Sequence, residues 1–205
     1  MYNKIKNEIK IHRFTLIEMH EEIKKTVEVL RAGGVILYPT DTVWGLGCDA
    51  TNEKAVKRIF DIKKRTDAKA MLVLIDNPAK LRSYVEEVPD MAWDLIELSE
   101  KPLTIIYPQA KNLATNLIAD DKTIGIRVTN EAFSKNLCAQ FRRPIVSTSA
   151  NISGNATPSN FSEVSDEIKK AVDYVVNFRQ DDLTKVNSSS IIKLGKGNLF
   201  QIIRK

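Results

Sequence analysis

The sequence contains few of the side chains that build disulfide frameworks, zinc sites and histidine-based catalytic sites. Its 205 residues include only two cysteines and two histidines: Cys48, Cys138, His12 and His20. No Cys/His cluster has the spacing of a zinc site, and two cysteines in apolar surroundings do not form a disulfide framework. Both histidines lie near the N-terminus, far from the motifs described below, which argues against a hydrolytic triad. We therefore expect no metal bound by protein side chains, and a chemistry based on positioning and charge stabilisation.

Long apolar segments and the common nucleotide-binding fingerprints are absent as well. No segment approaches the roughly 18 apolar residues that span a bilayer, and residues 1–8 lack the apolar run of a secretion signal. We therefore expect a cytoplasmic protein without a membrane partner. The Gly-x-x-x-x-Gly-Lys-Ser/Thr pattern of P-loop proteins does not occur, and Gly45-Leu46-Gly47 lacks the third glycine of a dinucleotide fingerprint.

The overall composition is that of a folded domain with a mild excess of positive charge. Hydrophobic residues make up 43% of the chain and charged residues 28%, which are ordinary values for a globular protein. A length of 205 residues predicts a single domain over 1–205 with a substantial core. The net charge of +5 suits an anionic ligand such as a nucleotide or RNA, but many unrelated proteins share it.

Predicted helices and strands alternate along the chain, which indicates the α/β class with a mixed sheet. Helices are expected over residues 21–32, 51–62, 77–85, 89–98, 131–141 and 160–171. Strands are expected over residues 9–17, 34–37, 71–75, 103–107, 123–128, 144–147, 173–178, 190–194 and 198–203. Gly195-Lys196-Gly197 predicts a hairpin turn between the last two strands.

The stretch 38–47 has the composition of a ligand-binding loop. It follows an apolar strand and contains one proline, two threonines, one aspartate, one tryptophan and two glycines. Glycine lets a backbone approach a ligand closely, and ligands commonly bind at loops that leave the strands of an α/β sheet. A tight turn capped by Thr40 and Asp41 explains the same residues equally well.

Four cations, Lys63, Lys64, Arg65 and Lys69, lie within seven residues at the end of the second predicted helix. One interpretation is a solvated helix terminus whose positive charge suits the helix dipole. Lys63 and Arg65 are two residues apart, however, so they share a face if the chain leaves the helix in an extended conformation. In that case Lys63, Arg65 and Lys69 would bind a polyphosphate.

Small polar residues follow the strand near residue 145, and a lone arginine interrupts the strand near residue 125. Ser147, Ser149 and Asn151 fall on one side of an extended backbone, where they could donate to phosphate oxygens; the alternative is a polar turn. Arg127 alternates with apolar residues, so it is either a surface residue or a clamp for a carboxylate or phosphate inside a cleft.

Together these residues resemble the YrdC-like family, the threonylcarbamoyl-AMP synthases. The resemblance runs from about Glu21 to Arg204 and rests on several motifs in the family's order. The three main motifs are Tyr38-Pro39-Thr40-Asp41-Thr42-Val43-Trp44-Gly45-Leu46-Gly47, Lys63-Lys64-Arg65 and Ser147-Thr148-Ser149-Ala150-Asn151-Ile152-Ser153-Gly154. Weaker matches are Lys101-Pro102-Leu103-Thr104, Gly125-Ile126-Arg127-Val128 and Ser189-Ser190-Ile191.

The resemblance implies a twisted mixed sheet with helices around a large basic cavity, in the short form of the family without an extra C-terminal domain. The implied reaction converts L-threonine, bicarbonate and ATP to threonylcarbamoyl-adenylate and pyrophosphate, for the N6-threonylcarbamoyl modification of tRNA adenosine 37. Mg²⁺ would assist, and the implied partners are tRNA or double-stranded RNA and the downstream tRNA threonylcarbamoyl-transferase machinery.

The resemblance also implies roles for individual residues. Lys63 and Arg65 would be catalytic. ATP would be bound by Lys63, Arg65, Lys69, Ser147, Ser149 and Asn151. Threonine or its carbamate would be bound by Thr40, Arg127 and Ser189.

The sequence departs from the family pattern at several positions. Trp44 replaces a tyrosine, Ala70 and Met71 replace Pro-Leu, Leu74 replaces a histidine, and Glu100-Lys101-Pro102 replaces Pro-Gly-Pro. Two alternatives follow. The protein could be a paralogue that binds a nucleotide but uses another acceptor, or an RNA-binding module without catalysis.

Overall fold

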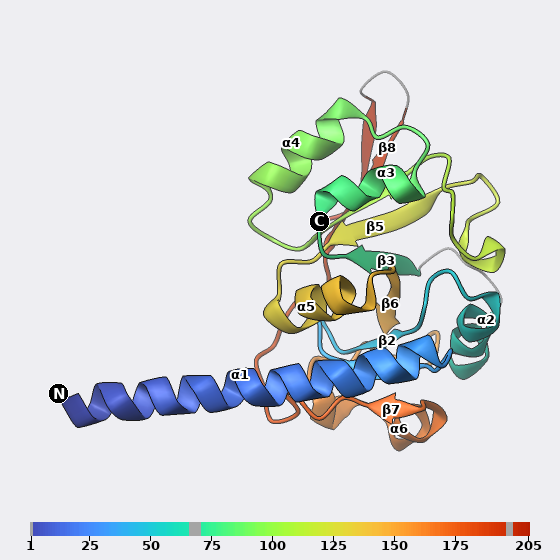
Figure 1. Cartoon of the computed structure of the whole chain (residues 1–205). Helices are drawn as coiled ribbons and strands as arrows, with labels where there is room; N and C mark the ends of the chain where they lie inside the picture. The colour runs from blue at the N-terminus through green and yellow to red at the C-terminus, as the bar shows by residue number, and fades with distance from the viewer. Residues whose placement is uncertain (1, 66–70, 196–198) are drawn as a thin grey trace.

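In the computed structural model, which describes residues 2–65, 71–195 and 199–205, the chain forms an α/β fold around a mixed sheet of nine strands (Figure 1). The strands are β1 (Ile36–Tyr38), β2 (Gly45–Gly47), β3 (Leu72–Ile75), β4 (Leu103–Tyr107), β5 (Ile124–Val128), β6 (Ile145–Ser149), β7 (Tyr174–Val175), β8 (Ser190–Leu194) and β9 (Phe200–Arg204). The α-helices are α1 (Tyr2–Arg31), α2 (Glu53–Ile62), α3 (Leu81–Tyr84), α4 (Asp90–Leu98), α5 (Ala132–Phe141) and α6 (Asp166–Ala171).

The strands follow the order β7-β1-β2-β6-β3-β5-β4-β8-β9 across the sheet. The pairs β1–β7, β3–β5 and β4–β8 are parallel, and the other neighbouring pairs are antiparallel. Strand β6 lies in the interior of the sheet, where Ser149 is opposite Gly45 of β2 and Ser147 is opposite Leu72 of β3. The predicted α/β class with a mixed sheet is therefore confirmed.

Helices cover the two faces of the sheet unequally. On one face, α2, α3 and α4 pack on apolar strand residues such as Val73, Ile105 and Ile126. On the other face, α1 and α5 cover only the part of the sheet that includes Ile36, Leu74 and Ile145. Because side chains alternate between the faces of a sheet, the uncovered positions lie on the same face as Leu74 and Ile145.

Helix α1 is the largest difference from the expected elements. Residues 9–17, which we expected to form a strand, lie within this helix, whose N-terminal half extends beyond the rest of the molecule (Figure 1). The apolar residues Leu16, Met19, Ile23 and Val27 recur at intervals of three or four residues, which is helical spacing, and the short alternation near Ile9 was misleading. Of the described residues, no helix has the length and apolarity that crossing a bilayer requires.

Smaller differences have local causes. Strand β2 was not predicted, because Gly-Leu-Gly has a weak strand preference and pairs only through its neighbours β1 and β6. The expected helix 160–171 is divided into a 3₁₀ turn at Phe161–Glu163 and the helix α6, which has its own cap at Ser165. The predicted strand 173–178 is shorter than expected. Strands β8 and β9 pair as predicted, and their connecting residues 196–198 lie outside the described residues.

Candidate active site

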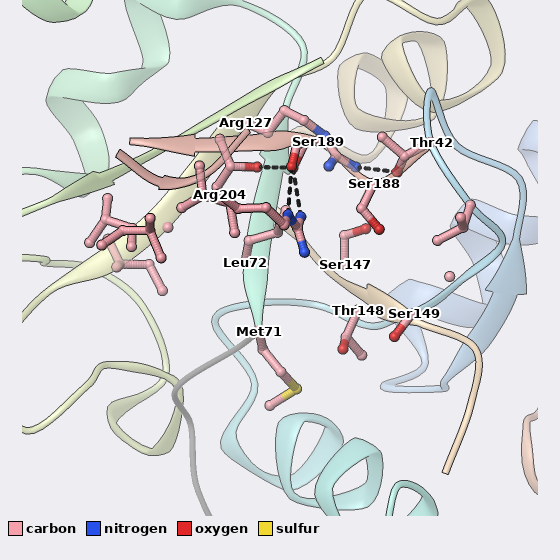
Figure 2. Close-up of a pocket in the computed structure, with 18 of the residues that line it drawn as sticks. Thr42, Met71, Leu72, Arg127, Ser147, Thr148, Ser149, Ser188, Ser189 and Arg204 are labelled. Carbon is pink, nitrogen blue, oxygen red and sulfur yellow. Dashed lines mark hydrogen bonds between the residues drawn. The ribbon is translucent and has the colours of Figure 1, made fainter. Parts of the chain in front are cut away.

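A cavity of about 270 Å³ lies on the part of the sheet that α1 and α5 leave uncovered (Figure 2). Its floor is formed by inner positions of the strands, which include Leu72, Thr104, Gly125, Arg127 and Ser147. Small residues occupy positions at which a hydrophobic core would carry large side chains, and the space that they leave is the cavity. A Cβ added at Gly125 would lie 3.4 Å from side-chain atoms of Leu72 and Thr104, so a larger residue here would fill part of the cavity.

Three arginines, Arg65, Arg127 and Arg204, line the cavity, and none of the described lining residues is acidic. The side chains come from the end of α2, from β5 and from β9. Burial lowers the pKa of Arg204, and the nearby charge of Arg127 lowers it further. Like charges that converge in a partly enclosed space favour an anionic ligand.

Arg127 is held in place by the motif that begins at Tyr38. Its guanidinium is 3% exposed, donates from Nη2 to Thr42 Oγ1 at 3.3 Å and lies 3.0 Å from Asp41 Oδ1. Burial raises the pKa of the Asp41 carboxyl group, and the charge of Arg127 opposes that effect. Arg127 Nε is buried without a hydrogen-bond partner among the described residues, and such a donor is costly unless an acceptor reaches it.

Thr40 supports the loop and does not line the main cavity. Its Oγ1 accepts the N–H of Thr42 at 3.1 Å and donates to the carbonyl of Val43 at 2.8 Å. The neighbouring residues Thr42 and Val43 line the cavity, together with Gly45. The motif therefore lines the cavity through Thr42. The resemblance assigned the substrate contact to Thr40, which does not line it.

Hydroxyl groups on β6 and directly before β8 form another wall of the site, the hydroxyl wall. Ser147 and Ser149 line the cavity, as the alternation along the strand predicted. Ser189 also lines it, and its Oγ lies 2.8 Å from Thr104 Oγ1. Arg204 donates to the Ser189 carbonyl at 2.8 Å and to its Oγ at 3.4 Å, so Ser189 positions Arg204 (Figure 2).

Lys63 and Arg65 point in different directions because of how α2 ends. Lys64 has a left-handed backbone with φ of 50°, and the Arg65 N–H donates to the carbonyl of Phe60 at 3.0 Å. Arg65 lines the cavity after this turn. Lys63 does not, and its Nζ donates to the carbonyls of Ser149 and Asn151. The extended exit that would place both cations on one face does not occur.

The remaining expected residues are distributed as follows. Asn151 lies behind the wall, where its Oδ1 accepts the Ser149 hydroxyl at 2.5 Å. Lys69 lies outside the described residues. Residues that sequence reasoning missed include Arg204, Thr42 and Thr104. Arg204 gave a signal similar to that of Arg127, a lone arginine in an apolar strand, although it stands at the end of β9 whereas Arg127 stands within β5.

The departures from the family pattern lie mostly away from the cavity. Leu74 is fully buried beneath α5 and is not among the residues that line the cavity. Met71 does line the cavity, and Ala70 lies outside the described residues. Trp44 is buried against Phe161, with ring centroids 4.7 Å apart. The segment Glu100-Lys101-Pro102 lines a separate hollow of about 140 Å³.

The described residues offer no ligand set for a resident metal ion. No group of three or more His, Cys, Asp or Glu side chains in this part of the chain is placed to hold one.

Comparison with known proteins agrees with the fold and the motifs. A profile of the Sua5/YciO/YrdC family, described as "Telomere recombination", matches residues 28–205. The chain is 38% identical over 158 residues to the threonylcarbamoyl-AMP synthase of Pseudoalteromonas translucida (strain TAC 125), covering 76% of this chain and 84% of the relative. It is 33% identical over 187 residues to the putative threonylcarbamoyl-AMP synthase of Methanocaldococcus jannaschii, covering 89% and 86%.

Solved structures share the same fold. E. coli YciO aligns with a TM-score of 0.76 at 27% identity and covers 89% of this chain and 88% of its own. P. abyssi Sua5 complexed with L-threonine aligns with a TM-score of 0.75 at 26% identity over 84% of this chain. This chain spans about half the length of that Sua5 chain, 50% of it.

Proposed function

This chain belongs to the Sua5/YciO/YrdC family, and we propose that it is a threonylcarbamoyl-AMP synthase, a nucleotidyltransferase that converts L-threonine, bicarbonate and ATP to threonylcarbamoyl-adenylate and pyrophosphate. The observation that carries the proposal is the cavity with three guanidinium groups and no carboxylate among its described lining residues. Curated relatives that match over most of their length and a Sua5 structure with L-threonine support it.

The charge of the cavity suits this reaction because the triphosphate, bicarbonate, the threonine carboxylate and the carbamate are all anions. Arg65, with the hydroxyls of Ser147 and Ser149, would bind the triphosphate through charge-assisted hydrogen bonds, which its place at the cavity supports. Arg127, oriented by Asp41 and Thr42, would bind a carboxylate. Arg204 of β9 adds a third cation to the lining.

The chemical step then follows from bringing two anions together. The neutral threonine amine first attacks the carbon of bicarbonate, a C–N bond forms and water leaves, which gives the carbamate anion. A carbamate oxygen then attacks the α-phosphorus of ATP. The bond between the α-phosphorus and the bridging oxygen breaks, and pyrophosphate leaves with the negative charge. Held in one cavity, the two reactants react as if within one molecule, and the guanidinium groups stabilise the charge on the leaving group. Mg²⁺, if it enters with ATP, would neutralise part of the triphosphate charge.

We also propose that the adenylate serves the N6-threonylcarbamoyl modification of tRNA adenosine 37 by a separate transferase in the cytoplasm. The net charge of +5 supports a weak contact with RNA. If tRNA binds directly, its affinity should fall steeply as the salt concentration rises, as measured by filter binding.

The test of the main proposal is a pyrophosphate-release assay with purified protein and MgATP. We expect release only when L-threonine and bicarbonate are both present, and loss of release when either is omitted. A panel of other amino acids identifies the acceptor. Release that is independent of threonine and bicarbonate, or no release at all, would overturn the proposal. Release that requires bicarbonate with a different amino acid would indicate the paralogue.

A further inference from the structure

Lys63 closes the turn of chain that follows β6. Its Nζ donates to the carbonyl oxygen of Ser149 at 2.5 Å and to that of Asn151 at 2.8 Å, and it lies 3.4 Å from Asn151 Oδ1. An ammonium group has three protons, so three acceptors use its full donor capacity. The backbone carbonyl of Lys63 also accepts the N–H of Ser153 at 2.9 Å. The end of α2 therefore binds both ends of one turn.

The turn at residues 149–153 bears on the position of Ser149 in the wall of the cavity. Ser149 lines the cavity, and its hydroxyl donates to Asn151 Oδ1. Asn151 Nδ2 in turn donates to the carbonyl of Asn155 at 2.7 Å. The Ser149 carbonyl also accepts the N–H of Asn151 at 2.9 Å, whereas Lys63 is the donor that the structure gives for the Asn151 carbonyl. Without the ammonium, the Asn151 carbonyl would lose this partner, and an unpaired polar group away from water is costly. The position of Ser149 therefore depends on Lys63.

Lys63 also lacks the features of a lysine that binds phosphate directly. Its side chain is 2% exposed, and it is absent from the described residues that line the cavity. Burial, and then the neighbouring charge of Arg65, lower its pKa to about 8. Arg65, two residues further along the chain, is the cation that faces the cavity.

We propose that Lys63 is a positioning residue: its ammonium ties the turn at 149–153 to the end of α2, so that Arg65 and Ser149 keep a fixed separation across the cavity, and it does not touch the nucleotide. This proposal rests on the function proposed above for its catalytic consequences, but its structural part can be measured separately.

The test compares Lys63→Met, which keeps the length of the side chain but removes its donors, with two reference variants. Arg65→Ala removes a cation that faces the cavity. Lys64→Met is the matched control, because its side chain is 64% exposed and only pairs with Glu167 at the surface. Amide hydrogen exchange measures the turn, isothermal titration with ATP measures the dissociation constant, and pyrophosphate release gives kcat.

We expect Lys63→Met to raise exchange at residues 151–155 by about tenfold or more, with no such change in Arg65→Ala or Lys64→Met. The dissociation constant for ATP should rise less in Lys63→Met than in Arg65→Ala, because Lys63→Met shifts the Ser149 hydroxyl but removes no cation from the cavity, whereas kcat falls by about tenfold or more. Lys63→Arg, which restores donors to the carbonyls, should recover protection of the turn. Thermal melting establishes that each variant is folded.

Two outcomes would overturn the proposal. Unchanged exchange at residues 151–155 in a folded Lys63→Met variant would show that the ammonium does not hold the turn. An ATP dissociation constant that rises as much as in Arg65→Ala would show that Lys63 contacts the nucleotide. If the native protein releases no pyrophosphate, the proposed function fails, while the exchange and titration results still decide the role of Lys63.

Discussion

One face of the sheet has two halves with opposite properties. Beneath α1 and α5, Ile36, Leu74 and Ile145 are fully buried in a dry core. Beyond the edge of α5, the same face carries glycines, hydroxyls and arginines around a cavity. The strands continue from one half to the other without a break, so the difference lies in the side chains and in the helices above them.

Strand β6 crosses this boundary. Ile145 packs under α5, whereas Ser147 and Ser149, on the same side of the strand, line the cavity. Strand β3 crosses it in the reverse direction, with Leu72 at the cavity and Leu74 in the core. The alternation of a strand therefore indicates which face a residue occupies, and the extent of the covering helix decides whether that face is a core or a site.

The largest expected effect comes from removing a large side chain in the covered half. Phe133 of α5 is fully buried and stacks on Phe178 with ring centroids 5.4 Å apart. Phe133→Ala should lower the free energy of unfolding by about 3–5 kcal/mol, because the cavity it leaves is not refilled. Urea denaturation measures this change, with the exposed Lys135→Ala as the control. A loss of less than about 1 kcal/mol would mean that this half is not closely packed.

Filling the cavity of the open half should weaken ATP binding and leave the protein folded, which is the opposite of the result expected for Phe133→Ala. Gly125→Leu places a branched side chain on the floor of the cavity, while Gly125→Ala adds only a Cβ at ordinary contact distance from Leu72 and Thr104. We expect the leucine variant to bind ATP about a hundredfold more weakly, which corresponds to about 2.7 kcal/mol. The alanine variant should bind almost normally. Equal binding by both variants, measured by titration calorimetry, would place the nucleotide elsewhere.

Removing one cation from the open half should weaken ATP binding by an amount comparable to filling it, or smaller. Arg65→Ala should weaken ATP binding by about 1.5–3 kcal/mol, because a charge-assisted hydrogen bond is lost. The unfolding midpoint should change little, and Lys64→Ala should bind ATP normally. If ATP affinity were unchanged with folding intact, Arg65 would be a solvated residue at the end of α2, which is the alternative interpretation given above.

The smallest expected effect is a pH dependence in the covered half. Glu22 on α1 is buried, and burial alone would raise its pKa, but hydrogen bonds from Tyr174, Lys25 and Asn177 bring the pKa below the ordinary value of 4.5. A carboxyl group whose folded pKa is lowered stabilises the protein above its unfolded pKa, and that stability is lost as the pH falls through the folded value. Glu22→Gln should therefore lower the free energy of unfolding at pH 7 by at most about 1 kcal/mol, and the difference from the native protein should shrink below pH 4 or so. A difference that stays constant across this range would contradict the assignment.

The sequence predicted much of the fold because its strongest patterns are local. The α/β class and most helices and strands follow from apolar spacing and from turn residues. Alternation along a strand predicted that Ser147 and Ser149 share one side, and both line the cavity, although Thr148 between them lines it as well. For Arg127 the sequence left a surface position and a cleft as alternatives, and the structure has it at the cavity. Strand β2 could not be predicted in this way, because Gly45–Gly47 becomes a strand only through its partners on both sides.

The parts of the site that were not predicted depend on contacts distant in sequence or on an unusual backbone. Nothing in the residue type of Lys64 indicates a left-handed conformation, yet that conformation separates Lys63 from Arg65. The contact of Thr40 with threonine stays a prediction, and in the structure its hydroxyl bonds within its own loop. Leu74 stands where the family pattern has a histidine, but such a pattern gives only a position along the chain, and α5 covers that position.

The interior place of β6 has a consequence for the order of folding. This strand alone joins β2, near the start of the chain, to β3, and it is made from residues 145–149, after both partners have been synthesised. Pairing strands that are far apart in sequence costs conformational entropy, because a long loop must close before the new contacts form. We therefore expect slow refolding for a chain of this size. The same strand supplies Ser147 and Ser149, so the protein acquires this wall of its cavity in the step that unites its sheet. An intermediate that lacks this strand would have neither a complete sheet nor a ligand with which to stabilise it.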